Sequence, residues 1–174
     1  LIPKEDLAPY RERAAEAAEH ARLMQVVSRP VGPSDDQAEA CRALMRLYER
    51  GNLVTVASRE TAADWARRGA LLGDPVCRER HARTLLEVGH DSDRAMGLHY
   101  LTMAACAGVD AAMYGLGMLL SGREDFGRYG GAATRAVLGV DKVQACSWLD
   151  QVLTPVIPVD ADLRVIRYAS AEEE

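Results

Sequence analysis

The sequence predicts an all-α protein, an α/α solenoid of about three helix pairs preceded by one additional helix at the amino terminus. Composition supports this fold class, because 48% of the 174 residues are apolar but only 5% are aromatic. The many alanines favour closely packed helices over a β-sandwich built on aromatic and β-branched residues. A recurring pattern of small and large residues supports it further, since repeats of about 20 to 50 residues are typical of stacked helical units.

Residues 1–29 are expected to form a capping helix, followed by a linker at 30–35. Asp6 can cap the helix, and Pro9 is tolerated in its first turn. The linker contains two prolines and a glycine, which break the helical pattern. The spacing of apolar residues predicts a stripe along this amphipathic helix that consists of Tyr10, Ala14, Ala17, Ala21 and Met24.

The repeat array is predicted over residues 36–153, in units 36–72, 73–107 and 108–153, and is followed by a tail at 154–174. Each unit begins with a first helix. In this helix a small residue stands four positions after the starting residue, and large residues stand eight and twelve positions after it. The starting positions are Asp36, Gly73 and Gly108, and the residues that follow are Ala40, Leu44, Tyr48, Cys77, His81, Leu85, Ala112, Leu116 and Leu120.

A second helix follows in each unit and has a pattern of its own. A small residue comes first, then an aromatic three positions later. Two small residues stand four and five positions after the aromatic, and a glycine stands eight after it. The matching residues are Ala62, Trp65, Gly69, Ala70 and Gly73 in the first unit, and Gly97, Tyr100, Ala104, Ala105 and Gly108 in the second. A third copy begins with Ala145 and Trp148 and fails at Pro155, where the chain leaves the array.

Gly117 stands where a helix interior is expected, although glycine costs a helix about 1 kcal/mol relative to alanine. We expect its missing side chain to make room for a neighbouring helix. The repeated aromatics Trp65, Tyr100 and Trp148 are expected to fill the space between the two helices of each pair.

The last unit contains about 13 extra residues, because the repeated aromatics are spaced by 35 and then by 48 residues. The extra residues lie within 122–140, a segment with five glycines. We expect an irregular loop there with a helical turn at 132–138. A functional loop and a harmless insertion are both compatible with this composition.

The sequence contains no phosphate-binding loop, metalloprotease motif or serine-hydrolase motif. Cys77 and His81 share a helix face, but no second pair is spaced to complete a zinc site, so neither metal nor cofactor is expected. The remaining cysteines, Cys41, Cys106 and Cys146, give no metal spacing and no dense disulfide framework. Buried free thiols are the simplest interpretation, with one or two disulfides as the alternative.

The net charge of −5 argues against a whole-molecule affinity for nucleic acid, which requires a basic surface. No stretch approaches the roughly 20 apolar residues that cross a bilayer. Because the chain begins with Leu1, we expect any targeting segment to lie outside it.

Four segments resemble Sel1-like repeats, which are relatives of tetratricopeptide repeats. They are AxxxLxxxYxxG at 40–51, AxxxLGxxL at 112–120, and the second-helix elements AADWARRGALLGD and GVDKVQACSWLDQ. The resemblance covers about residues 36–153. It implies adaptor, assembly or regulatory work, often in bacteria and often in the cell envelope or in secretion systems. It also implies that the first helices line a concave surface, where the side chains that the core does not claim face a bound partner.

That partner-facing stripe changes character along the array, from an arginine-rich end to an apolar end. Arginine suits carboxylates, while tyrosine and methionine supply adaptable contact area, so the stripe would fit a peptide or helix with acidic residues at one end. An ordinary solvated face and an oligomer contact remain alternatives. The stripe consists of Glu39, Arg42, Arg46, Glu49, Arg50, Val76, Glu79, Arg83, Leu86, Glu87, Ala111, Tyr114, Met118, Ser121 and Gly122, and the predicted partner-binding residues among them are Arg42, Arg46, Glu79, Arg83, Glu87, Tyr114 and Met118.

We therefore expect a non-catalytic protein–protein interaction module, an adaptor or scaffold that binds a peptide or protein on its concave face, in the bacterial periplasm or cytoplasm. An immunity or inhibitor protein of a secreted toxin would use the same surface. The alternative from another class is a thiol-dependent enzyme or redox sensor acting through Cys77 or another thiol. That alternative requires a solvent-accessible thiol with a lowered pKa.

Overall fold

The computed structural model describes residues 7–30, 34–122, 129–139 and 141–153, and over these residues it contains eight α-helices and no strand. The all-α prediction is confirmed. The expected tail at 154–174 lies outside the described residues. The helices are α1 (Ala8–Val27), α2 (Ser34–Arg50), α3 (Arg59–Leu71), α4 (Pro75–Val88), α5 (Asp91–Cys106), α6 (Asp110–Leu120), α7 (Gly131–Leu138) and α8 (Lys142–Leu153).

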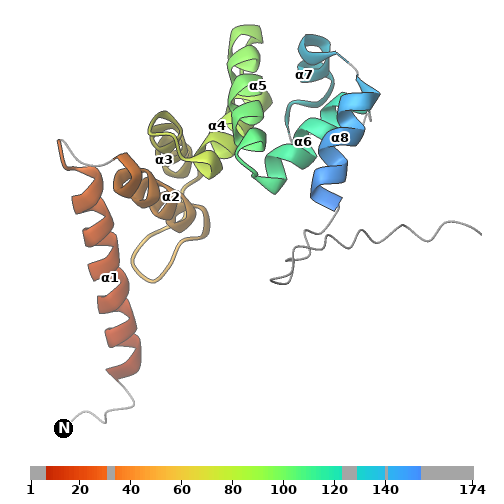
Figure 1. Cartoon of the computed structure of the whole chain (residues 1–174). Coiled ribbons are helices and arrows are strands. Elements are labelled where there is room, and N and C mark those ends of the chain that lie inside the picture. The colour runs from red at the N-terminus through yellow and green to blue at the C-terminus, as the bar shows by residue number, and fades with distance from the viewer. Residues whose placement is uncertain (1–6, 31–33, 123–128, 140, 154–174) are drawn as a thin grey trace, which may run out of the picture.

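The helices form a curved array in which each packs mainly against its neighbours in chain order (Figure 1). α2 pairs with α3, and α4 pairs with α5. α6 pairs with α8 instead of with the short α7, which lies within the segment predicted to be an insertion. The arrangement is compatible with a helical repeat.

The ends of α3 and α5 share one cap, at the glycines that close the second-helix pattern. Gly73 and Gly108 both have positive φ, 99° and 83°. In each case the glycine amide donates to the carbonyl three residues earlier and the next amide donates to the carbonyl five residues earlier, at 2.9 to 3.1 Å. This pair of bonds is the Schellman motif, which glycine favours because it lacks a Cβ. The sequence repeat therefore corresponds to a repeat in local structure.

Gly117 of α6 lies directly against α8. A Cβ at this position would lie 2.6 Å from Cγ of Leu149 and 3.3 Å from the carbonyl oxygen of Ala145. The prediction that a neighbouring helix fills the space of the missing side chain is confirmed. The close contact with α8 requires a residue without a Cβ, and this contact offsets the helix propensity that glycine loses relative to alanine.

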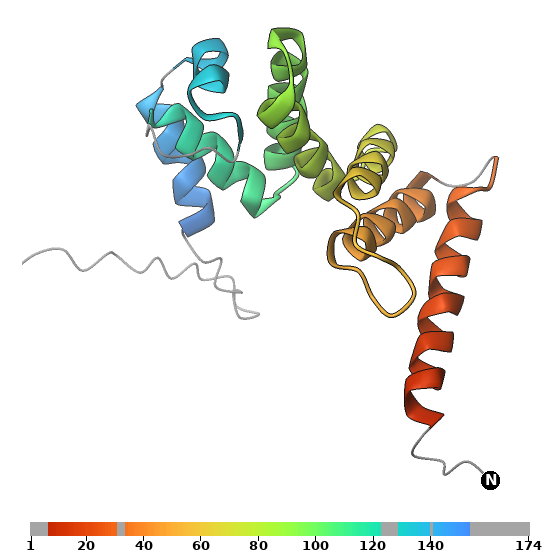
Figure 2. The same cartoon turned by 180° about the vertical axis from the view of Figure 1, so that it is seen from behind.

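α1 packs with a face that includes Met24 of its predicted stripe but not the other four residues. Tyr10 is 73% exposed, and the three alanines of the stripe are exposed as well. The buried side chains of this helix are Leu23 and Val27, near its carboxyl end. The reason is visible in both views, because α1 leans on α2 with its carboxyl-terminal half while its amino-terminal half extends beyond the other helices (Figures 1 and 2).

The contact between α6 and α8 can be tested with Gly117→Ala. The added methyl group meets Leu149, so we expect a loss of about 1 to 2 kcal/mol in the free energy of unfolding despite the better helix propensity of alanine. Denaturant unfolding followed by circular dichroism measures this. In a Leu149→Ala background the space is open, and the same substitution should be neutral or stabilising. Equal losses in both backgrounds would contradict the contact.

Candidate functional site

The centre of the predicted stripe is covered by the chain itself. Glu79 of α4 is only 4% exposed, contrary to the expectation that it faces a partner, and Leu86 is fully buried. Tyr129, from the inserted segment, donates a hydrogen bond to a carboxylate oxygen of Glu79 at 2.6 Å. The physical reason is Gly115 of α6, where a Cβ would lie 2.5 Å from the ring of Tyr129. The stripe is therefore not one continuous surface.

Tyr129 is a residue that the sequence analysis missed. It is 1% exposed, and its hydroxyl oxygen also lies 3.1 Å from the carbonyl oxygen of Ala111. We call the site formed by Glu79, Ala111 and Gly115, in which the side chain of Tyr129 lies, the Tyr129 socket. The available signal was Gly115 itself, because the corresponding position of the preceding unit, 35 residues earlier, carries Arg80.

Two of the four arginines of the predicted stripe, Arg42 and Arg83, are engaged within the fold. Arg42 is half-buried and its Nη1 lies 3.5 Å from Oδ2 of Asp74, a buried carboxylate that also caps α4. Arg83 pairs with Glu87 at 3.9 Å, and Glu87 pairs with Arg59 at 2.9 Å. The pairs Arg42–Asp74 and Arg59–Glu87 join different elements, which the sequence could not indicate because the partners are distant in the chain. Arg83 and Glu87 lie four residues apart on α4.

The other three predicted residues lie on two separate elements. Arg46 of α2 is exposed and faces α1. Tyr114 is exposed and Met118 half-buried on α6, two helix pairs further along. The structure therefore does not bring the arginine-rich and apolar ends of the stripe together.

An open cleft of about 480 Å³ lies between α1 and α2, and we call it the α1–α2 cleft. Arg46 and Arg50 line it from α2, and both side chains are exposed. Within the described part of the chain, neither guanidinium forms an ion pair. His20 lines the cleft from α1, and its Nε2 lies 3.1 Å from the hydroxyl of Tyr48. This bond links α1 to α2 beside the cleft.

The acidic side chains of the cleft already have donors. Glu19 accepts two hydrogen bonds from Arg22, at 2.7 and 2.8 Å, and these hold the pKa of Glu19 below its ordinary value. Glu16 accepts the backbone amide of Leu53 at 2.8 Å, which ties the loop after α2 to α1. The cationic side chains of the cleft, Arg46 and Arg50, lie on the α2 wall, and the acidic side chains of Glu16 and Glu19 lie on the α1 wall.

The loop after α2 brings exposed apolar side chains beside the cleft. Its backbone is fixed by a bond from the Asn52 amide to the Thr55 carbonyl, and Asn52 also accepts two backbone amides through its side chain. The exposed side chains are Leu53, Val54 and Val56, of which Val56 is 86% exposed. A rigid loop that presents aliphatic side chains to solvent is typical of a contact surface.

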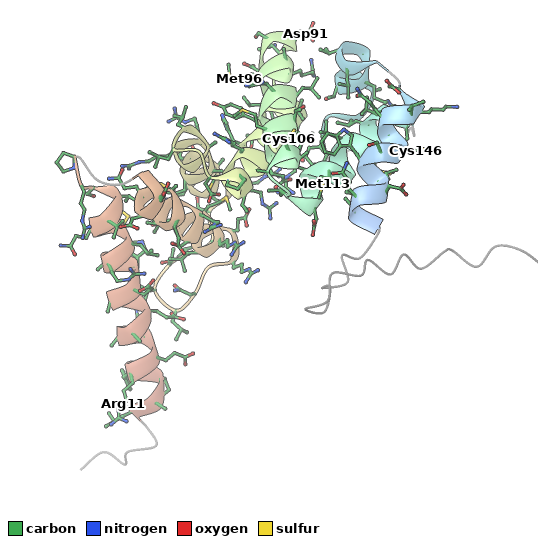
Figure 3. The ribbon with its side chains drawn as sticks, viewed as in Figure 1. Arg11, Asp91, Met96, Cys106, Met113 and Cys146 are labelled. Carbon is green, nitrogen blue, oxygen red and sulfur yellow. The ribbon has the colours of Figure 1, made fainter. Side chains whose placement is uncertain are left out.

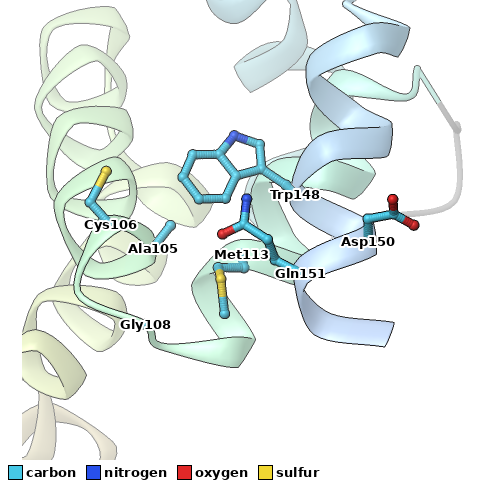
Figure 4. A pocket seen from close by; sticks show the side chains of 7 residues that line it. All are labelled: Ala105, Cys106, Gly108, Met113, Trp148, Asp150 and Gln151. Atoms are coloured by element: carbon cyan, nitrogen blue, oxygen red, sulfur yellow. The ribbon is translucent and has the colours of Figure 1, made fainter. Parts of the chain in front are cut away.

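A second open groove, of about 620 Å³, lies between the end of α5 and α8. Trp148 reaches across it toward Ala105 and Cys106, and Met113 of α6 forms its floor (Figure 4). Asp150 and Gln151 line the groove from α8, the helix that also carries Trp148. The groove is mainly apolar, and we call it the Trp148 groove.

The four cysteines are all free, but they divide into two kinds. Cys41 and Cys77 are buried, and burial raises the pKa of both thiols, for Cys77 with a further contribution from the nearby Asp74 carboxylate. Cys106 at the end of α5 and Cys146 on α8 are exposed, and Figure 3 shows their places in the array. The expectation of buried thiols is therefore wrong for these two, because no further helix of the described residues covers them.

Neither a metal site nor a membrane span is found in the described ranges. No group of three or more histidine, cysteine, aspartate or glutamate side chains there could hold a metal ion. None of the described helices is long and apolar enough to cross a membrane. Comparison with protein families, with curated proteins and with solved structures finds no match to this chain.

Thiol labelling tests the division of the cysteines. In the native protein we expect Cys106 and Cys146 to react with an alkylating reagent and Cys41 and Cys77 to react only after denaturation, since burial opposes thiolate formation. Mass spectrometry of labelled peptides assigns each site. Native labelling of Cys77 would contradict the packing at α3 and α4.

His81 predicts a pH dependence of stability. Its ring packs on Tyr100 with centroids 5.3 Å apart, and burial, with a smaller contribution from Arg67, lowers its pKa below the ordinary value. The unfolded chain therefore binds the proton more readily, so stability is complete above about pH 6.5 and falls as pH decreases below it.

Between pH 7.5 and 5, urea unfolding should show a larger loss of stability for the unaltered protein than for His81→Leu. Leucine is the residue that the first and third units carry at the equivalent position. The matched control is His99→Gln, which replaces an exposed histidine. This variant should lose as much stability between pH 7.5 and 5 as the unaltered protein. Identical pH profiles for the protein and for His81→Leu would rule out this role of His81.

Proposed function

We propose that this chain is a non-catalytic binding module that holds an acidic segment of a protein partner in the α1–α2 cleft. The observation that carries the proposal is the pair Arg46 and Arg50. Both are exposed and lack a carboxylate partner among the described residues, whereas Arg42, Arg59, and Arg83 are paired within the fold. Arginine binds carboxylates through two parallel hydrogen bonds, so two unpaired guanidiniums in one cleft favour an acidic ligand.

The shape and the walls of the cleft support a segment rather than a small metabolite. The cleft is open along α1, and the apolar side chains of Leu53 and Val54 lie beside it. A partner segment would place carboxylates on Arg46 and Arg50 and an aliphatic or aromatic side chain against the loop. The acidic side chains of Glu16 and Glu19 on the opposite wall repel the carboxylates of the segment and so orient it.

We also propose that the helix pairs form a Sel1-like solenoid and that the module serves as a bacterial adaptor or scaffold. Support comes from the matching caps at Gly73 and Gly108 and from the buried small residues at matching positions of the units. An immunity or inhibitor protein remains a special case of the same binding function. A thiol-dependent enzyme has less support, because burial raises the pKa of both Cys41 and Cys77.

Peptide display against the unaltered protein, followed by fluorescence anisotropy with the selected peptides, tests the binding function. We expect the selected peptides to combine aspartate or glutamate with apolar residues. The double variant Arg46→Glu, Arg50→Glu should lose at least tenfold in affinity, because each substitution removes a charge-assisted bond and adds repulsion. Affinity should also fall with rising salt concentration.

The matched control is Arg11→Glu, Arg13→Glu, which makes the same change of charge on the exposed amino-terminal half of α1. This variant should bind within twofold of the unaltered protein. If both double variants bind equally, the ligand site lies elsewhere, and the absence of any selected peptide would reject the binding function.

A further inference from the structure

The Tyr129 socket has a defined chemistry that goes beyond the α1–α2 cleft. Its base is the buried carboxylate of Glu79, which accepts the hydroxyl of Tyr129 at 2.6 Å. Its wall is Gly115, which leaves the space that the aromatic ring occupies. A filler with no hydroxyl would leave the carboxylate with one partner fewer, so the socket selects a phenol over a purely apolar ring.

The equivalent place between α2 and α4 is closed in another way. There Arg80 stands at the position that Gly115 has in the next unit, and its Nε lies 3.2 Å from Glu49 and 3.7 Å from Glu79. The space between α2 and α4 is therefore closed by Arg80, a side chain of the first helix α4 itself. Between α4 and α6 the helices leave an opening, and a segment from outside the repeat pattern fills it.

The segment that fills the socket is anchored by Tyr129, Thr134 and Leu138, and Gly130 lies against the carbonyl of Leu86. Over residues 129–138 the buried side chains are Tyr129 and Thr134, and the hydroxyl of Thr134 donates to the carbonyl of Tyr129 at 2.6 Å. The alanines and the valine of α7 are exposed. An isolated helix of eight residues is marginal in water, and Gly130 and Gly139, both with positive φ, flank it. Local release of the segment therefore costs less than global unfolding.

We propose that the Tyr129 socket is a recognition site for an unphosphorylated tyrosine on an extended segment of a partner protein, and that Tyr129 is its internal competitor. The partner's phenol donates to Glu79 and its ring lies against Gly115. A phosphate on that tyrosine would face a buried carboxylate and be rejected. The tethered Tyr129 acts at an effective concentration of order 1 mM. A partner therefore displaces Tyr129 only if it adds contacts that the segment 129–138 does not make.

A peptide supplied in trans tests this directly. The probe is a fluorescent, amino-terminally acetylated peptide that copies residues 129–138, and the receptor is the full chain with Tyr129→Ala. We expect it to bind the variant at least tenfold more tightly than the unaltered protein, whose socket is occupied. Probes with phenylalanine or phosphotyrosine in place of the tyrosine should bind the variant at least fivefold more weakly. The receptor control is Tyr10→Ala, which removes an exposed tyrosine of α1 and should behave as the unaltered protein.

Equal binding to both receptors, or no binding to a folded Tyr129→Ala protein, would overturn the proposal. If that variant does not fold, hydrogen exchange on the unaltered chain decides. The proposal requires the amides of 129–138 to exchange at least tenfold faster than those of α4 and α6, and Tyr129→Phe to accelerate the former selectively. Exchange of all three at one rate would mean that the socket opens only on global unfolding, and the proposal would fail. None of these results depends on Arg46 or Arg50, so failure here leaves the α1–α2 cleft untouched.

Discussion

Close approach of helix backbones at glycine positions sets the spacing of this array. A Cβ at any of three glycines would come within 2.5 to 2.8 Å of an atom of the neighbouring helix. Gly69 of α3 meets Cys77 of α4, Gly97 of α5 meets Leu86 of α4, and Gly117 of α6 meets Leu149 of α8. Because dense packing tolerates few voids, apolar side chains fill the space opposite the glycines. Cys77 and Leu86 are buried and Leu149 is half-buried, and each contact joins two helices that are adjacent in the array.

The close spacing also explains why much of the array's polar surface is used internally. Arg42 and Arg80 reach carboxylates on adjoining elements, so these charged groups are partners for the fold and are not available to a ligand. Binding capacity is left where the regular packing is interrupted. One such place is the α1–α2 cleft, where the long first helix diverges from the array (Figure 1). The other is the Tyr129 socket, where Gly115 opens a space that the helices themselves do not fill.

The sequence predicted the features that depend on spacing along the chain. The helix contact at Gly117 was predicted, as was the recurrence of glycine at 73 and 108, and the structure adds that both of these glycines form the same cap. The features that depend on distant partners were not predicted. Glu79 has the spacing of a surface residue, and only the arrival of Tyr129, fifty residues later, buries it. The stripe on α1 failed for a related reason, because amphipathic spacing cannot show how much of a helix has a neighbour to pack on.

Nuclear Overhauser spectroscopy on the isotopically labelled full chain tests the central claim, that the array is built on helix contacts at glycine. We predict cross-peaks from the glycine α protons to the side chain that fills each missing Cβ. The pairs are Gly97 with the methyl groups of Leu86, Gly117 with the methyl groups of Leu149, and Gly115 with the ring of Tyr129. Observation of all three would establish the spacing of the helices and the filling of the socket together. Absence of the Gly97 and Gly117 cross-peaks in a folded, fully assigned protein would contradict the account.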